Sequence, residues 1–151
     1  MSQANDNLHA ILAVRCELQL DTPHATLQAL RNCAQSGTFD VLHNELGRAN
    51  GYVAWADINK ESWRALCERG RLPSYAFEWN EGRLLLLLDI ALARAQRHAL
   101  RTSLERLFAT RRAVVFLRRG CVHIYARSQG RMRLVARRRF DAAAPAEPGP
   151  N

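Results

Sequence analysis

The sequence predicts an α/β (α+β) fold: a mixed, largely antiparallel sheet flanked by helices. Two segments near the start carry apolar residues at helical spacing, and short runs that alternate apolar and polar residues follow them, separated by turns. Helical and strand patterns mix along the chain without an internal repeat. We expect one domain over residues 1–141 and a flexible Ala/Pro-rich tail at 142–151, which has little to bury.

The first two expected elements are helices. Residues 7–18 place apolar side chains at near-helical spacing, which predicts a short amphipathic helix. A second helix is expected to begin at Asp21-Thr22-Pro23, with Asp21 or Thr22 as its cap and proline in the first turn. Ser36-Gly37 should end it, because glycine adopts the left-handed conformation that terminates helices.

A β-hairpin is expected next. Residues 39–43 alternate apolar and polar side chains, as a half-buried strand does. Residues 47–51, which begin and end with glycine, indicate a turn, and residues 52–56 form the second strand. Asn59 can cap a helix that starts at Lys60 and ends near Gly70.

The middle of the chain contains a run of five leucines. Residues 71–81 read as a loop, and the run from Arg83 to Ile90 suits a strand that is covered on both faces. A buried helix is the alternative, because leucine favours helices. We prefer the strand because Gly82 precedes it and a separate helix, at about 92–109, follows.

Three strands complete the predicted order ααββαβαβββ. They are expected at 114–117, 122–126 and 132–136, with Gly120 and residues 128–130 as their turns.

The chain is strongly basic, which favours an acidic partner. Its formal net charge is +8, carried almost wholly by arginine, since Lys60 is the only lysine. The segment Arg111–Arg139 holds ten arginines and no acid, with Phe116, Tyr125 and Phe140 interleaved or adjacent. It could bind a nucleic-acid backbone and stack bases on its aromatics, dock an acidic protein, or be a solvated face.

Several classes of protein receive no support from the sequence. The four cysteines are widely spaced and form no CxxC pair, so no zinc or other metal site is indicated. The longest apolar run is far short of a membrane span. Residues 1–7 are polar and do not resemble a signal peptide, so we expect a cytoplasmic protein.

Asp89 is the position with the most unusual surroundings, because a carboxylate ends the run of leucines. Burial disfavours the charged form of a carboxyl unless a partner compensates, and such a group can orient a base or accept a proton. The alternative is that Asp89 lies at the end of a strand and caps the next helix.

Two motifs and their spacing resemble a known family. Gly51–Asp57, with Tyr52 and Trp55, is similar to the Tyr-x-Ser-Trp-Ala segment of the hemolysin-type (RTX) toxin-activating lysine acyltransferases. The segment from Trp79 to Asp89 resembles the Trp-x-x-Gly-(Asp)-Arg-x-(Trp/Leu)-x-x-Asp pattern of the same family. Residues 100–104 and 114–120 are similar to later segments, so the resemblance covers roughly residues 39–125.

The resemblance implies a fold like that of the GNAT acetyltransferases and a single acyltransferase-like domain. It implies transfer of a fatty acyl group from acyl carrier protein, the donor substrate, to a lysine ε-amine of a protoxin-like acceptor. No bound cofactor is implied, and a homodimer is possible. The family uses a histidine together with an aspartate that matches Asp89, and His24 is the candidate base. Acyl carrier proteins are acidic, which fits the arginine-rich chain.

The chain also departs from the family pattern. The family histidine lies in a Ser-Pro-x-His-Arg segment, where this chain has Thr22-Pro23-His24-Ala25. Ala54 replaces the serine of the first motif, and residues 90–94 lack the proline and glycine that follow the family aspartate. A non-catalytic GNAT-like protein that binds a partner is therefore an alternative, as is a basic protein that binds nucleic acid.

Overall fold

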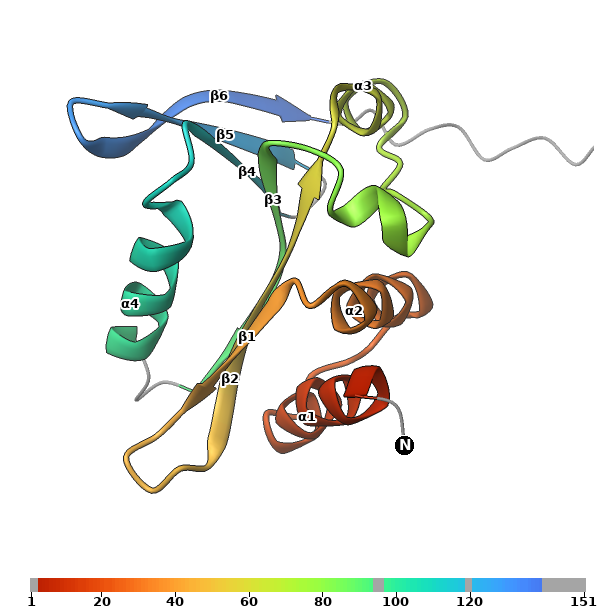
Figure 1. Ribbon diagram of the computed structural model, residues 1–151, viewed down its shortest axis with the longest axis vertical. Helices are drawn as coiled ribbons and strands as arrows, with labels where there is room; N and C mark the ends of the chain where they lie inside the picture. The colour runs from red at the N-terminus through yellow and green to blue at the C-terminus, as the bar shows by residue number, and fades with distance from the viewer. Residues whose placement is uncertain (1–2, 94–96, 119–120, 140–151) are drawn as a thin grey trace, which may run out of the picture.

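A six-stranded sheet runs through the middle of the molecule, with its strands in chain order (Figure 1). The computed structural model describes residues 3–93, 97–118 and 121–139. Neighbouring strands are antiparallel, except β3 and β4, which run parallel. The elements, including the short 3₁₀ helix η1, are α1 (Gln3–Glu17), α2 (His24–Ser36), β1 (Phe39–His43), β2 (Ala49–Ile58), α3 (Lys60–Arg69), η1 (Ala76–Trp79), β3 (Leu84–Leu92), α4 (Arg97–Phe108), β4 (Ala113–Arg118), β5 (Cys121–Ser128) and β6 (Arg131–Arg139).

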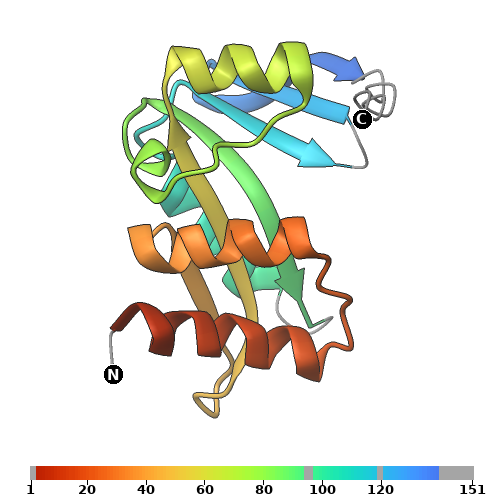
Figure 2. The same ribbon diagram turned by 90° about the vertical axis from the view of Figure 1, so that its right-hand side faces the viewer.

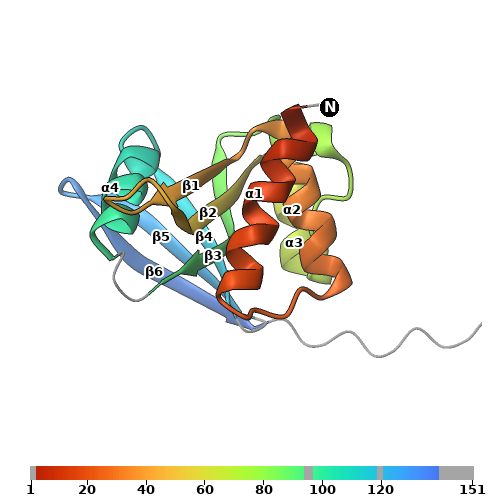
Figure 3. The same ribbon diagram turned by 90° about the horizontal axis from the view of Figure 1, so that it is seen from below.

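Helices cover both faces of this sheet. Of the described helices, α1, α2 and α3 lie on one face and α4 lies on the other, as Figure 3 shows from below. Figure 2 looks onto the face with three helices, where α1 and α2 lie side by side across the strands. The buried side chains form two clusters, one on each face of the sheet. The prediction of a mixed, largely antiparallel sheet flanked by helices is confirmed.

The second helix begins later than the sequence indicated. α2 starts at His24, with Pro23 at its N-cap position and no side chain capping it. The prediction that Asp21 or Thr22 caps this helix is therefore wrong. Arg15 of α1 engages both residues instead, because its Nε donates to Thr22 Oγ1 at 2.9 Å and its guanidinium donates to the carbonyl oxygen of Asp21.

β1 and β2 form the predicted hairpin, but its turn is shorter than the sequence indicated. β2 already begins at Ala49, so the prediction of a turn over 47–51 is wrong in its second half. Gly51 lies inside the strand, where an added Cβ would come 3.0 Å from the carbonyl oxygen of Ala91. Glycine fits there because β3 approaches closely, and not because the chain turns.

The ends of α3 and η1 are held by side-chain caps. Asn59 caps α3 as predicted, since its side-chain oxygen accepts a hydrogen bond from the backbone N–H of Ser62 at 2.9 Å. Gly70 ends the helix in the left-handed conformation. Residues 71–81, expected as a loop, contain η1, whose start is capped by the Glu78 carboxylate. These caps fix the chain that connects α3 to β3.

The run of leucines is a strand, as predicted, and it is covered on both faces. Leu86 packs in the cluster beneath α1, α2 and α3, whereas Leu87 packs in the cluster against α4. The helix expected from residue 92 begins later, at Arg97. Leu92 instead ends β3, since no proline or glycine stops the strand earlier. Ala95, assigned to that helix from the sequence, lies outside the described residues.

The last three strands lie where the sequence placed them. β5 and β6 are joined by Gln129 and Gly130, both with positive φ, as the central residues of a type I′ hairpin turn have. Gly120, expected as a turn, lies outside the described residues, as does the predicted tail at 142–151. Within the part of the chain that the structure describes, no helix is long and apolar enough to cross a membrane.

Candidate functional site

An irregularity in β3 decides which way Asp89 points. Asp89 pairs with Ala54 of β2, whereas the next β2 residue, Trp55, pairs with Leu87, so Leu88 is an extra residue in β3. Side chains alternate along a regular strand, which would place Asp89 on the same face as Leu87, toward α4. The bulge at Leu88 moves Asp89 to the opposite face, where it meets α1 and α2.

Asp89 is held by two side chains from other elements. Arg15 of α1 donates to Asp89 Oδ2 at 2.5 Å, and the Tyr52 hydroxyl of β2 donates to the same oxygen at 2.5 Å. Arg15 also donates to the Tyr52 oxygen at 2.6 Å. The alternative that Asp89 caps the following helix is wrong, because Asp89 lies inside β3 and binds these two side chains.

These contacts define the charge state that the site favours. The side chain of Arg15 is 8% exposed and that of Asp89 is 29% exposed, so each charge compensates the other in a largely buried place. Burial raises the pKa of the Tyr52 hydroxyl, and the hydrogen bond to the Asp89 carboxylate raises it further. Tyr52 therefore stays protonated and acts as a donor. The Asp89 carboxylate thus has a cation beside it and is positioned by two donors, Arg15 and Tyr52.

The sequence analysis did not identify Arg15 or assign a role to Tyr52. A signal for Arg15 was present, since it occupies the face of α1 that also carries Leu8 and Ile11. An arginine at such a position has to find a buried acceptor. Its partner, Asp89, lies 74 residues away along the chain, so the sequence alone could not pair them.

A groove opens next to Asp89 because β3 and β4 diverge. Their parallel pairing ends at Leu87 and Phe116, although both strands continue. A cavity of about 150 Å³ lies over the diverging part. This β3–β4 groove is lined by residues of α2, β3, β4 and the segment after α3, namely Ala25, Thr26, Ala29, Leu30, Leu72, Leu88, Asp89 and Leu117. Its wall is thus mostly apolar, with one carboxylate.

His24 lies in a neighbouring hollow and not beside Asp89. This hollow has a volume of about 420 Å³ and shares Ala25, Ala29 and Leu72 with the β3–β4 groove. His24 is exposed at the first position of α2. No hydrogen bond joins His24 to Asp89 in the described residues, where Asp89 binds the side chains named above. The two predicted site residues therefore face connected hollows without touching.

Trp79 contributes an unused donor to the same region. Its side chain is fully buried and it lines the hollow that contains His24. Its indole Nε1 has no acceptor among the described residues. Buried donors are rarely left unpaired, so this nitrogen is an exception in the described part of the chain.

Half of the ten arginines in the segment Arg111–Arg139 lie on β6, the strand at the edge of the sheet. The exposed arginines of the edge strand β6 are Arg131, Arg133, Arg137, Arg138 and Arg139. Phe116 and Tyr125 instead pack in the cluster against α4 and line an apolar cavity of about 270 Å³. They are not free to stack on bases, and Phe140 lies outside the described residues. Nucleic-acid binding stays a prediction that rests on charge.

Comparison with known proteins finds a similar solved structure but no match by sequence. No protein-family model matches the sequence, and no curated protein matches it. A solved structure that is similar is that of GphF, a GNAT-like decarboxylase in complex with isobutyryl-CoA, with 24% sequence identity and a TM-score of 0.52. The match covers 76% of this chain and 62% of that one, so the chain spans about three fifths of GphF. The fold is therefore GNAT-like, as the resemblance implied.

Proposed function

We propose that this protein binds an acyl group as a phosphopantetheine thioester in the β3–β4 groove and transfers it to a lysine amine of another protein. The observation that carries the proposal is the groove itself, an apolar hollow opened by diverging parallel strands beside a held carboxylate. The likeness in fold to GphF, whose structure contains isobutyryl-CoA, supports an acyl-handling role.

The groove has suitable partners for both parts of such a donor. Leu30, Leu88 and Leu117 offer apolar contacts to an acyl chain. Beyond Leu87, the β3 edge that faces β4 has no described strand partner, so its backbone N–H and C=O groups can bind the amides of a pantetheine arm. We propose acyl carrier protein as the donor because the chain carries a net charge of +8 and such carriers are acidic.

The transfer step requires a neutral amine. A lysine amine has a pKa of about 10.4 and must lose a proton to attack the thioester carbonyl. The ammonium first releases this proton to solvent. In the proposed step the neutral amine attacks the thioester carbonyl, the N–C bond forms, the His24 imidazole accepts the second proton from the attacking nitrogen, and the C–S bond breaks. The pantetheine thiolate leaves and is protonated by the imidazolium. Asp89 stabilises the positive charge that develops on the attacking nitrogen, because Arg15 and Tyr52 hold its carboxylate in place.

The second candidate is a protein that binds a partner or an acyl thioester without transferring the group. Two observations favour it. Asp89 already has Arg15 as its counter-ion, and His24 is exposed with no described hydrogen bond to the carboxylate. A base that is not oriented by a second group contributes less to proton transfer.

Intact-mass spectrometry of a lysine-bearing acceptor tests the proposal. The acceptor is incubated with the protein and acyl-loaded carrier protein, using the wild type, Asp89→Asn, His24→Ala and the matched control His9→Ala, an exposed histidine on α1. We expect acyl mass on the acceptor with the wild type and the control, and a loss of at least about a hundredfold in rate with His24→Ala.

Binding measured in parallel separates the two candidates. Fluorescence anisotropy of a labelled acyl-pantetheine reports occupation of the groove whether or not transfer occurs. Binding without acyl mass on any acceptor, from folded protein, would contradict the transferase and support the second candidate. Transfer that His24→Ala leaves unchanged would contradict the role of His24.

A further inference from the structure

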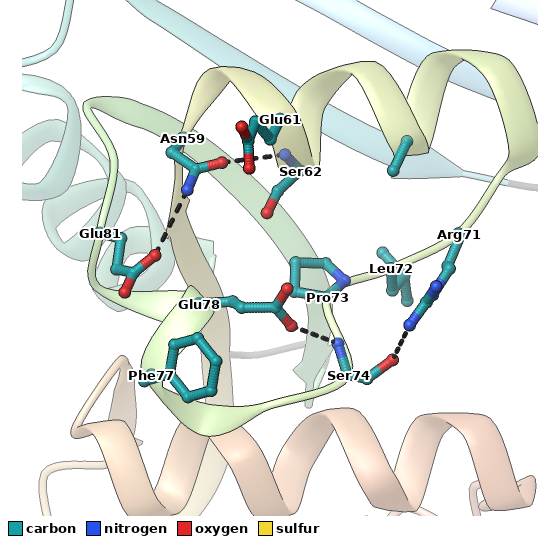
Figure 4. Close-up of a pocket in the computed structure, with 11 residues that line it drawn as sticks. Asn59, Glu61, Ser62, Arg71, Leu72, Pro73, Ser74, Phe77, Glu78 and Glu81 are labelled. Carbon is teal, nitrogen blue, oxygen red and sulfur yellow. Dashed lines mark hydrogen bonds between the residues drawn. The ribbon is translucent and has the colours of Figure 1, made fainter.

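The hollows of this molecule have different linings, and the one at the start of α3 is bridged by hydrogen bonds between its own residues (Figure 4). Asn59 accepts from the backbone N–H of Ser62, and its Nδ2 donates to Glu81 Oε2 at 3.3 Å. The Glu78 carboxylate accepts from the backbone N–H of Ser74 at 2.9 Å. These polar groups therefore hold the connection between β2, α3 and η1 in place.

A cavity of a different kind lies on the face of the sheet opposite to the β3–β4 groove, between α4 and the strands β3 to β6. This α4 cavity has a volume of about 270 Å³ and is lined by Leu87, Ile90, Leu104, Phe108, Val114, Phe116, Tyr125 and Met132. Among these described residues, Tyr125 alone has an oxygen or nitrogen in its side chain. A buried water needs about two to four polar partners, so this lining suits a hydrocarbon rather than water.

One side chain joins the two walls of the α4 cavity. Arg127 of β5 donates to the carbonyl oxygen of Phe108 at the end of α4, and its Nε donates to that of Arg111 at 3.2 Å. Its Nη1 donates to the carbonyl oxygen of Gly130, in the turn before β6, at 3.4 Å. The hairpin of β5 and β6 is thus tied to the end of α4 (Figure 1). Because protein interiors have few voids larger than a water molecule, a hollow of this size with fixed walls suits a ligand.

A basic row continues from the α4 cavity on the same face of the sheet. Phe116, which lines the cavity, is paired with His123 of β5, and His123 is paired with Arg137 of β6. Paired side chains on neighbouring strands lie on one face, with Cβ atoms about 5 Å apart. Arg137 is exposed and makes no ion pair among the described residues. Leu134, the partner of Tyr125, is 42% exposed, so this face is open to solvent beyond the cavity.

We propose that the α4 cavity binds the hydrocarbon chain of a carboxylate, whose anionic head lies at His123 and Arg137. A cavity of about 150 Å³ holds a benzene ring, so scaling by volume gives a chain of roughly ten carbons for the α4 cavity. A second copy of this protein is a poor occupant, because the five exposed arginines of β6 would repel their equivalents. The proposal does not depend on acyl transfer, since the β3–β4 groove lies on the other face.

A series of chain lengths tests whether the tail is buried. Binding of saturated carboxylates from hexanoate to dodecanoate to the full chain is measured by calorimetry, below the concentrations at which they form micelles. We expect each added CH₂ to strengthen binding roughly fourfold up to about ten carbons, as burial of one CH₂ does, and longer chains to gain no more. An affinity that does not rise with chain length overturns the proposal.

Variants that fill the α4 cavity locate the site. Leu104→Trp should weaken decanoate binding at least about tenfold, because the indole displaces two or more CH₂ groups of the chain. Leu27→Trp, the same change at an exposed position of α2, should leave binding unchanged. Met132→Trp, at a half-buried position on the edge strand, replaces Leu104→Trp if that variant unfolds. Decanoate binding that the cavity variant leaves unchanged, or that Leu27→Trp weakens equally, overturns the assignment.

The head group is tested by comparing decanoate with decan-1-ol. Arg137→Gln should weaken decanoate binding roughly threefold, as expected for an exposed charge, and leave decan-1-ol binding unchanged. Arg133→Gln is the matched control on β6, because Arg133 pairs with Ala126 and lies on the other face with Ile124. Equal effects of Arg137→Gln on the two ligands would contradict the placement of the carboxylate.

A groove variant distinguishes a free carboxylate from the acyl thioester of the proposed function. Ala29→Trp obstructs the β3–β4 groove and should weaken binding of acyl-pantetheine but not of decanoate, whereas Leu104→Trp should do the reverse. Decanoate binding that is lost with Ala29→Trp and kept with Leu104→Trp overturns the proposal and places the chain in the groove. Decanoate binding in the α4 cavity without acyl transfer supports the proposal and counts against the transferase alone.

Discussion

Replacing Arg15 with methionine should lower the free energy of unfolding by about 3 kcal/mol. The Arg15 side chain is 8% exposed and donates to Asp89, Tyr52 and Thr22. Methionine keeps much of the volume but leaves the Asp89 carboxylate without a cation. Removing one partner of a buried pair costs about 3–5 kcal/mol, and the lower end applies because the Asp89 side chain is 29% exposed.

Urea unfolding followed by circular dichroism measures this loss. For a slope of about 2 kcal/mol/M, the midpoint should fall by roughly 1.5 M. Arg31→Met is the matched control, because Arg31 is exposed on α2, and it should change the stability by less than about 0.5 kcal/mol.

The double variant Arg15→Met/Asp89→Leu tests whether the loss comes from an unpaired charge. It should be more stable than the sum of the two single changes predicts, because neither charge is left without its partner. A cost of less than about 1 kcal/mol for Arg15→Met, or strictly additive losses in the double variant, would refute the argument that these two groups form a buried pair.

Two other predictions concern local features. Burial raises the pKa of the Cys33 thiol from 9.0 to about 12, so iodoacetamide at pH 8 should label exposed Cys16 and leave Cys33 unreacted until the protein unfolds, as peptide mass mapping would show. Labelling of Cys33 in the folded protein at pH 8 would contradict its burial. Because the pKa of this thiol is raised in the folded protein, its contribution to the free energy of unfolding is complete below pH 9 and is lost as the pH rises toward 12. Asn59→Ala should lower the free energy of unfolding by about 1 kcal/mol, since it removes the acceptor for the Ser62 amide, whereas Asn59→Gly should lower it by about a few tenths of a kcal/mol. Equal unfolding midpoints for the wild type and Asn59→Ala would count against the cap.

Local patterns predicted most of the elements of this fold. Asn59 was identified as a cap because a side-chain amide can accept from the first turn of a helix, an interaction between residues three apart. The leucine run was recognised as a strand from its flanking elements. The resemblance to the toxin-activating acyltransferases implied a GNAT-like fold, which the structure has, and membership of that family stays a proposal.

The wrong predictions concern residues whose role is decided by a contact with another element of the fold. Asp21 and Thr22 have suitable chemistry for a helix cap, but Arg15 binds both, so α2 starts at His24 instead. Gly51 looked like part of a turn, yet it is needed inside β2 because β3 lies against it. Neither the contacts of Arg15 nor the approach of β3 to Gly51 could be inferred from the residues next to these positions.

The candidate site likewise combines features that the sequence predicted with features that depend on the tertiary structure. The sequence by itself identified a carboxylate at the end of a run of leucines and a histidine near the start of the second helix, because these are properties of adjacent residues. Only the tertiary structure decided that a bulge at Leu88 turns Asp89 toward α1 and that Arg15 and Tyr52 hold it there. A bulge depends on the register between two strands, and a buried ion pair depends on which distant charge the packing brings close; a linear pattern specifies neither.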